Sequence, residues 1–219
     1  MTLHLFSYTI WYSVILVRRS KINIFYVHPD PEVAAQSMVD RHVVKMILET
    51  AQLLSTAHRV LDGEEYVGQS QSGRKAKRWR LNGDLENILY SATHINHPSA
   101  VWTRETSGNY DWLARHLLAL GREYSYRYDR VHSTIDKLGD VLITPPQNIA
   151  QQDVTLMPSC MADDYIVGDD PITNYRNYYN KGKTNLLRWT KRFPPAWIEG
   201  EIILAPGAKH IYSAGRQNV

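Results

Sequence analysis

The stretch that decides the fold is EVAAQSMVDRHVVKMILETAQLLSTAHRVL, which runs from Glu32 to Leu61. Apolar residues recur in it at steps of three and four, the spacing that builds an apolar stripe along an α-helix. These residues are Val39, Val43, Met46 or Ile47, Ala51, Leu54, Ala57 and Leu61. Asp30 can cap such a helix, Pro31 suits its first position, and Asp62-Gly63 ends it. The pattern predicts one long amphipathic helix at the centre of the molecule.

Other parts of the chain predict further helices and little β-structure. The expected helices cover 84–96, 109–128 and 133–142, and a last one starts at Asp170-Pro171 and runs through Tyr179. A β-leaning run at 22–27 is a strand or an extended lead-in, 68–73 is a loop or hairpin tip, and 144–170 is irregular. We therefore expect a mainly α protein, a single-domain helical bundle with irregular loops.

Composition limits the class of protein. A length of 219 residues with 43% hydrophobic residues suits one domain, residues 22–219, with a core of its own. The single cysteine, Cys160, rules out an internal disulfide framework and fits a reducing compartment. The net charge of +3 is weak evidence for a polyanionic partner, so local clusters of charge have to carry that argument.

Residues 1–21 form an extension before the predicted domain. An apolar run from Leu3 to Val17 precedes Arg18-Arg19, the reverse of the order in a secretory signal. The run is also shorter than the roughly 20 residues that span a bilayer. We expect no stable membrane partner, with a membrane anchor as the lesser alternative, and a cytoplasmic location, which is the host cytoplasm if the protein is viral.

One face of the central helix is polar along its whole length. Its residues are spaced by three, four, three, four and three, so they share one side of the helix: His42, Lys45, Glu49, Gln52, Thr56 and Arg59. A solvated face would also have this spacing, and Lys45 with Glu49 could be an ordinary surface pair. The face, however, combines acid, base, imidazole and amide within a strongly apolar helix. This mixture favours a functional site.

A second group lies at Thr93-His94-Ile95-Asn96-His97-Pro98. His94 and His97 have a spacing that can serve a metal, but no third ligand follows at a diagnostic distance. Histidine is also favoured at a helix C-terminus because of the helix dipole. We expect a substrate-facing or structural role for both residues, and no metal or cofactor.

Two segments combine cations with aromatic rings. The segment 174–197 holds no acidic residue, and a shorter run at 74–80 surrounds a tryptophan. Such cations can neutralise phosphates while the rings stack on exposed bases, although a basic surface over an aromatic core has the same composition. The predicted DNA-binding residues are Arg176, Tyr178, Lys181, Lys183, Arg188, Trp189 and Lys191, with Arg74, Lys75, Lys77, Arg78 and Trp79.

The sequence Asp40-Arg41-His42, followed by Glu49, resembles the phage pyrimidine-dimer DNA glycosylase family known as endonuclease V. That family has Asp-x-His on its first helix and its catalytic Glu nine positions after the Asp. The lead-in Lys21-Ile22-Asn23-Ile24 is similar to the family's lead-in. Bacterial relatives show the Lys-x-x-x-Glu-x-x-Gln pattern of Lys45, Glu49 and Gln52. Uncharacterised phage proteins resemble the chain over about residues 22–197, which suggests a viral origin.

The resemblance implies an N-glycosylase with abasic-site lyase activity on damaged or modified bases of duplex DNA. Glu49 would stabilise the cationic sugar and take a 2′ proton, while His42 would orient Glu49 or bind a phosphate. Gln52 and Arg59 would contact the substrate. The attacking amine would be the α-amine, that of Thr2 after removal of Met1 or of a start nearer residue 22, or else Lys45.

Two other classes of function remain open. The chain could be a non-catalytic phage DNA-binding protein whose helix face contacts phosphates and bases. It could also be a transferase or hydrolase that acts on modified viral nucleotides. The sequence contains no phosphate-cradling Gly-rich loop and no dinucleotide fingerprint, which disfavours a kinase or a redox enzyme.

Overall fold

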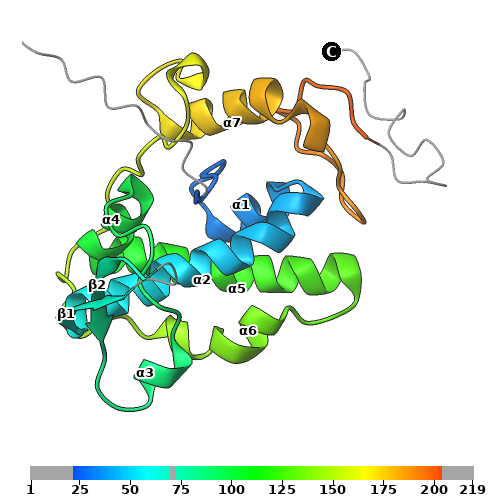
Figure 1. Ribbon diagram of the computed structural model, residues 1–219. Helices are drawn as coiled ribbons and strands as arrows, with labels where there is room; N and C mark the ends of the chain where they lie inside the picture. The colour runs from blue at the N-terminus through cyan, green and yellow to red at the C-terminus, as the bar shows by residue number, and fades with distance from the viewer. Residues whose placement is uncertain (1–21, 70–72, 204–219) are drawn as a thin grey trace, which may run out of the picture.

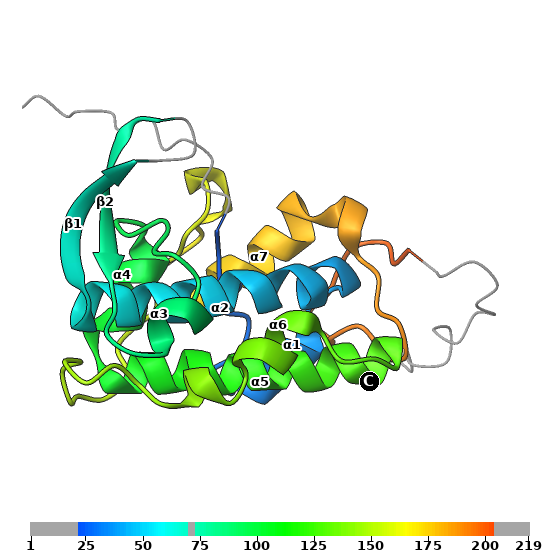
Figure 2. The same cartoon turned by 60° about the horizontal axis from the view of Figure 1, so that its bottom comes forward.

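A computed structural model describes residues 22–69 and 73–203 of the chain. The predicted mainly α architecture is confirmed, since about half of the molecule is helical and the described part has a single two-stranded sheet. Two long helices, α2 (Asp40–Asp62) and α5 (Ser107–Tyr128), lie across the centre, and α7 (Pro171–Gly182) lies beside the N-terminal half of α2 (Figures 1 and 2). The other helices are α1 (Pro31–Ser37), α3 (Leu85–Ile88), α4 (Pro98–Glu105) and α6 (Ser133–Leu138).

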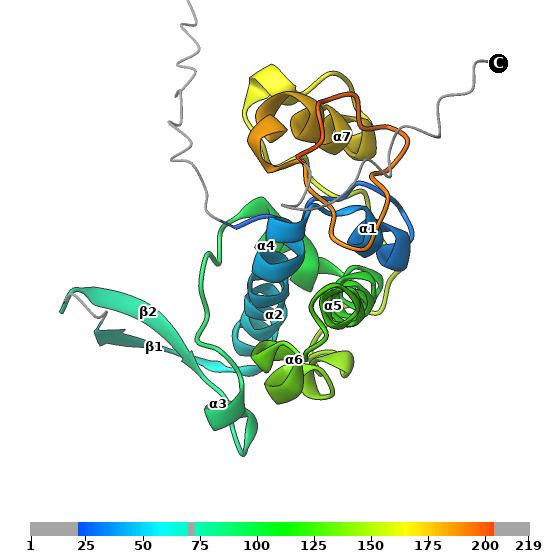
Figure 3. The same cartoon turned by 90° about the vertical axis from the view of Figure 1, so that its right-hand side faces the viewer.

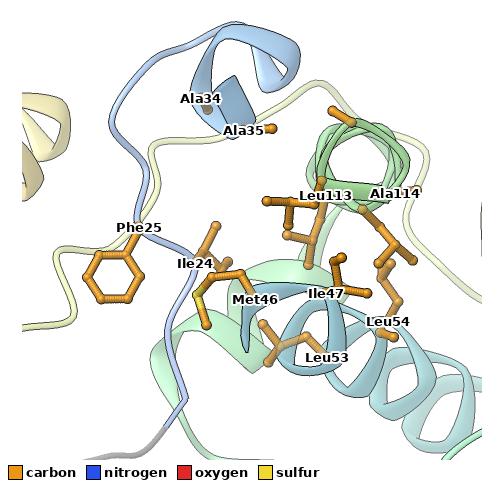
Figure 4. Packing of buried hydrophobic residues seen from close by; sticks show 14 of the residues in the cluster. Ile24, Phe25, Ala34, Ala35, Met46, Ile47, Leu53, Leu54, Leu113 and Ala114 are labelled. Atoms are coloured by element: carbon orange, nitrogen blue, oxygen red, sulfur yellow. The ribbon is translucent and has the colours of Figure 1, made fainter. Parts of the chain in front are cut away.

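The core lies between α2, α5 and the lead-in 22–27. Ile47 and Leu54 of α2 face Leu113 of α5, whereas Met46 faces Ile24 of the lead-in (Figure 4). All five side chains are fully buried, and each such burial contributes roughly 1.5–3 kcal/mol. The lead-in has no regular secondary structure and is largely buried, and it pairs with no strand in the described residues. Packing onto α2 and hydrogen bonds of Asn23 hold it in place.

The prediction of one helix over 32–61 is wrong, because the backbone is extended at Met38 and Val39. The break lets α1 turn aside and pack on α5. It is fixed from a distant part of the chain: the Arg188 carbonyl accepts from the amide of Asp40, and the indole N–H of Trp189 donates to the Ser37 carbonyl. Tertiary hydrogen bonds therefore override an unbroken helical pattern.

The predicted helix over 84–96 is also wrong. Only Leu85–Ile88 is helical, and the chain then runs without regular secondary structure, through a turn at 95–96, to the N-cap of α4 at His97. The carbonyls of Leu89 and Tyr90 accept hydrogen bonds from the Arg59 side chain. These bonds compete with continuation of the helix. The expectation for 109–128 is confirmed by α5, and the cap-plus-proline start at 170–171 is confirmed by α7.

The basic run at 74–80 is largely a strand. β1 (Glu64–Gln69) and β2 (Lys75–Arg80) pair antiparallel, with Glu64 opposite Arg80 and Gln69 opposite Lys75. The hairpin follows directly after α2 and stands away from the helices (Figures 2 and 3). α7 and the hairpin therefore lie at opposite ends of α2.

Within the described residues no helix is both long and apolar enough to cross a membrane. Thr2 and the rest of the predicted extension lie outside the described residues.

Candidate functional site

The carboxylate of Glu49 is the centre of the polar face of α2. One oxygen, Oε1, lies 2.7 Å from the Nζ of Lys45, and the other accepts from the main-chain N–H of Asn23 at 3.1 Å. Burial raises the pKa of Glu49, although Lys45 and the Asn23 N–H both act to lower it. A carboxylate in this condition is a better proton acceptor than one in water.

Lys45 brings an amine to the same point from the solvent side. Its side chain is 51% exposed, whereas that of Glu49 is 10% exposed. Gln52 follows one turn later on the same side of α2 and is half-buried. The structure thus brings together three of the predicted residues, in the order amine, carboxylate and amide, at the boundary between solvent and core.

The lead-in is held against Glu49 by a local network. The Asn23 side-chain oxygen accepts from the amides of Ile24 and Phe25, and its Nδ2 donates to the Cys160 carbonyl. Phe25 has a φ of 58°, a left-handed conformation that is unfavourable for a bulky residue. Such strain costs of the order of 1–3 kcal/mol and concentrates at functional sites.

His42 lies behind the lead-in and is buried. Its ring stacks on Phe25 with centroids 4.1 Å apart, and its Nδ1 is 2.6 Å from the hydroxyl of Tyr179. Burial, with smaller contributions from Lys183 and Lys45, lowers the pKa of His42 to about 3. A neutral, buried imidazole has no charge to offer a phosphate. The expectation of phosphate binding is therefore corrected: His42 positions the lead-in.

The two predicted histidines of the 93–98 group have separate tasks. His97 caps α4, where its Nδ1 accepts from the amide of Ser99. His94 is exposed and left-handed, with a φ of 50°, and its Nδ1 lies 2.8 Å from the Thr93 hydroxyl. Thr93 in turn bonds Thr56, which places this loop beside α2. Among residues 22–69 and 73–203, no three His, Cys, Asp or Glu side chains are grouped to hold a metal.

Arg59, at the far end of the polar face, belongs to the fold. Its guanidinium donates to the carbonyls of Trp79, Glu86, Leu89 and Tyr90 and pairs with the Glu86 carboxylate at 2.7 Å. Only 6% of the side chain is exposed. The expected substrate contact is corrected, because the side chain is enclosed and its donors are directed at protein acceptors.

A pocket of about 520 Å³ opens beside Lys45, between α2 and the segment 185–190. Cations line it from both sides: Arg41 and Lys45 on α2, and Arg188 opposite. The full lining is Asp40, Arg41, Val44, Lys45, Tyr128, Asn185, Leu186, Arg188, Thr190 and Ile203. Arg41 was not among the residues predicted from the sequence, although its position four residues before Lys45 places it on the same side of the helix.

Asp40 forms the buried base of this pocket. Its carboxylate accepts from Arg127 at 2.9 Å and from the amide and hydroxyl of Thr190, and the guanidinium of Arg188 lies 3.5 Å away. Glu123 extends the network by pairing with Arg127 and with Arg192. The Asp of the Asp-x-His motif is therefore a structural residue that joins α2, α5 and the C-terminal segment.

The segment 174–197 is partly interior. Trp189 is 4% exposed and is a core residue, which corrects its assignment to a binding surface. The guanidinium of Arg176 donates to the carbonyl of Val27 and lies over the Trp197 ring. Lys183 lies over Tyr178, and Lys191 pairs with Asp129. Lys181 is exposed on the outer side of α7.

The cations of the hairpin are more open. Lys75, Lys77 and Arg80 are exposed, and Arg78 and Trp79 are half-buried. Lys77 pairs with Glu65 across the strands at 2.8 Å, and Arg74 is exposed just before β2. The two predicted basic clusters therefore differ. Side chains of 174–197 are partly buried in the core, whereas those of 74–80 project from the molecule.

Comparison of the chain with protein-family models, with curated proteins and with solved structures gives no match. The arrangement of side chains itself is therefore the basis for a functional hypothesis.

Proposed function

We propose that the protein is a DNA-processing enzyme, an N-glycosylase with abasic-site lyase activity that acts on damaged or modified bases. The observation that carries the proposal is the contact of 2.7 Å between the Lys45 amine and the buried carboxylate of Glu49. The pKa of Glu49 is raised. An amine next to such a carboxylate has the two groups needed to form an imine and then to break it down.

The reaction divides between the two groups. The neutral amine attacks C1′ of the nucleotide, the bond from C1′ to the base breaks, and the base leaves with the bonding electrons and takes up a proton. Loss of the ring oxygen from C1′ gives an imine. A base then removes a proton from C2′, and the electrons expel the 3′ phosphate. Glu49 stabilises the positive charge at C1′ in the first stage and removes the proton in the second.

The amine must lose a proton before it attacks. An ammonium group beside a carboxylate is stabilised in its charged form, which opposes the reaction. Burial of Glu49 acts in the opposite direction, because a carboxyl with a raised pKa accepts that proton more readily. Lys45 therefore gives its proton to Glu49 across the 2.7 Å contact and becomes the nucleophile. Glu49 passes this proton to the departing base, and the carboxylate so restored stabilises the charge at C1′ and later takes the proton from C2′.

A second amine is supported by the lead-in. The main-chain nitrogen of Asn23 lies 3.1 Å from the other oxygen of Glu49. A chain processed to begin at Asn23 would carry its α-amine at that position. An α-amine has a pKa near 8, against about 10.4 for a lysine side chain, and is thus neutral more often at pH 7.

Electrostatics support DNA as the substrate. Arg41 and Arg188 border the pocket beside Lys45, and further cations lie at each end of α2, on α7 and on the hairpin. The 23 residues of α2 span about 34 Å, which is roughly one turn of a duplex. A duplex along α2 would contact both groups of cations and present a nucleotide to Glu49.

Borohydride trapping on duplex DNA with one abasic site tests the proposal. We expect a reduced covalent adduct, mapped by mass spectrometry to Lys45 in the full chain or to the α-amine of Asn23 in a chain processed to begin there. Lys45→Met should abolish it in the first case, and an N-terminal tag in the second. Glu49→Gln is the control, because exposed lysines trap abasic sites nonspecifically and such trapping does not depend on Glu49.

The second candidate is a non-catalytic duplex-binding protein, which the projecting basic hairpin favours. An absence of any Glu49-dependent adduct, with duplex binding intact, would leave this candidate and remove the imine mechanism.

A further inference from the structure

The hairpin of β1 and β2, here called the arm, has no cover on either face. Val67 is 70% exposed and Tyr66 40% exposed, and no hairpin residue belongs to the buried core. An isolated pair of strands is marginally stable in water, so contact with a partner would stabilise the arm. Figure 3 shows it extending sideways from the α2 end of the molecule.

The register of the strands separates the side chains of the arm into two faces. Alternate residues point to the same side, so cross-strand pairs share a face. One face carries Glu64, Tyr66, Gly68, Ala76, Arg78 and Arg80, and is called the arginine face. The other carries Glu65, Val67, Gln69, Lys75, Lys77 and Trp79, and is called the lysine face.

Small residues lie at the outer end of the arginine face, where Gly68 is opposite Ala76. A Cβ on Gly68 would come within 3.1 Å of the Arg78 side chain and 3.2 Å of the Tyr66 ring, so both side chains pack against Gly68. Nearer the body, the Arg80 guanidinium lies 5.0 Å from the centre of the Tyr66 ring. The face thus presents two arginine side chains arranged around one aromatic ring.

Charge on the arm increases towards its tip. The two acidic residues of the strands lie at the base, where Glu65 pairs with Lys77 and Glu64 is opposite Arg80. Lys75 and Arg78 lie farther out, where β1 has no acidic residue. A partner that meets the outer half of the arm therefore meets positive charge and few carboxylates.

We propose that the arm lies in the major groove of duplex DNA, with the arginine face towards the base edges and the lysines directed at phosphates. The inference rests on the proposal that DNA is the substrate. Six residues per strand give the arm a length of about 20 Å. The major groove is about 12 Å wide and admits a two-stranded ribbon, and arginine is the usual side chain for base edges there.

Two double variants with equal loss of charge test which face is used. Arg78→Gln/Arg80→Gln changes the arginine face, and Lys75→Gln/Lys77→Gln changes the lysine face. Binding to undamaged duplex is measured by fluorescence anisotropy, in competition with methyl green for the major groove and netropsin for the minor groove. We expect both variants to bind about tenfold more weakly in low salt, because each loses about two contacts with anionic DNA. The protein concentration is raised for each variant so that every complex starts at the same occupancy. Methyl green should then displace the full chain and the lysine variant, and it should displace the arginine variant at least fivefold less effectively, because the contacts left to that variant are with phosphates.

A pair of uncharged variants keeps the test independent of charge. Gly68→Val adds bulk to the arginine face, and Gln69→Val adds similar bulk to the lysine face. We expect Gly68→Val alone to weaken binding, by about fivefold. Gly68→Val would also displace the Arg78 side chain and the Tyr66 ring. Thermal melting of each variant checks that the core is intact, since none of the substituted residues is in it.

Three results would overturn the inference: unchanged affinity in both double variants, equal loss in the two valine variants, or displacement by netropsin in place of methyl green. These readouts do not depend on catalysis. Failure of borohydride trapping with methyl green competition intact would overturn the catalytic proposal and leave the arm in the groove.

Discussion

The two halves of α2 carry similar polar residues with opposite surroundings. In the N-terminal half, Glu49 is held by the half-exposed Lys45 and by one main-chain N–H of the lead-in. In the C-terminal half, Arg59 is enclosed by main-chain carbonyls and the Glu86 carboxylate. The first arrangement leaves a carboxylate whose charged form is disfavoured, and the second stabilises a charge fully. A helix face of uniform spacing thus divides into a candidate site and a structural clamp.

The largest effect on stability is expected from Arg59→Met. The substitution keeps length but leaves the carbonyls of Leu89 and Tyr90 and the Glu86 carboxylate without their donor. Each buried carbonyl left without a donor costs about 1–3 kcal/mol, so we expect the free energy of unfolding to fall by several kcal/mol. Urea unfolding followed by circular dichroism measures it, with Arg59→Lys as a control that should recover part of the loss. A decrease below about 1 kcal/mol would mean that the clamp is dispensable and that the contrast between the halves is false.

In contrast to Arg59→Met, Glu49→Gln should reduce turnover without reducing stability. On abasic DNA we expect turnover to fall by about 10²–10³-fold, because the amide cannot accept the proton or balance a positive charge at C1′. Stability at pH 7 should be equal or higher, since the raised pKa shows that burial disfavours the ionised carboxyl. Single-turnover incision and urea unfolding on the same sample measure both quantities. Normal turnover on a verified substrate would remove Glu49 from the site.

Buried histidines should make the free energy of unfolding depend on pH. Burial lowers the pKa of His116 to about 4, while the unfolded chain takes up a proton near 6.5. The free energy of unfolding should therefore fall as pH drops from 6.5 to 4, by roughly 3 kcal/mol from this residue. His42 adds to the loss in the same direction, and Glu49, with its raised pKa, partly offsets it. Urea midpoints between pH 7 and 4.5 check the slope, which His116→Phe should flatten.

Local signals in the sequence were sufficient for most helices. The periodic apolar residues of α5 and the cap-plus-proline starts at 30–31 and 170–171 identify elements whose hydrogen bonds lie within a few residues. The contact of Lys45 with Glu49 is also local, since residues four apart in a helix face each other. For this reason the centre of the candidate site could be found from spacing.

Interactions between distant residues could not be found in this way. The break before α2 depends on Arg188, far along the chain, and the end of α3 depends on Arg59. Trp189 has the composition of a binding surface, but its indole lies in the core and bonds Ser37. Cations and rings look alike in sequence whether they cover a core or project from it. Only the fold separates 174–197 from the arm.

The smallest effect is expected on DNA binding, when cations of the segment 174–197 are neutralised. Replacing Lys181, Lys183, Arg188 and Lys191 by Gln removes four cations, which as independent phosphate contacts would lower the slope of log affinity against log salt by about 3.6. Two of the four already have carboxylate partners: Arg188 lies 3.5 Å from Asp40, and Lys191 lies 2.6 Å from Asp129. We therefore expect the slope to fall by only about one to two. Anisotropy titrations at several salt concentrations measure it, with Lys75→Gln/Lys77→Gln on the arm as the reference. A larger loss per cation in 174–197 than in the arm would show that this segment, despite its internal pairing, supplies the main contact with the phosphates.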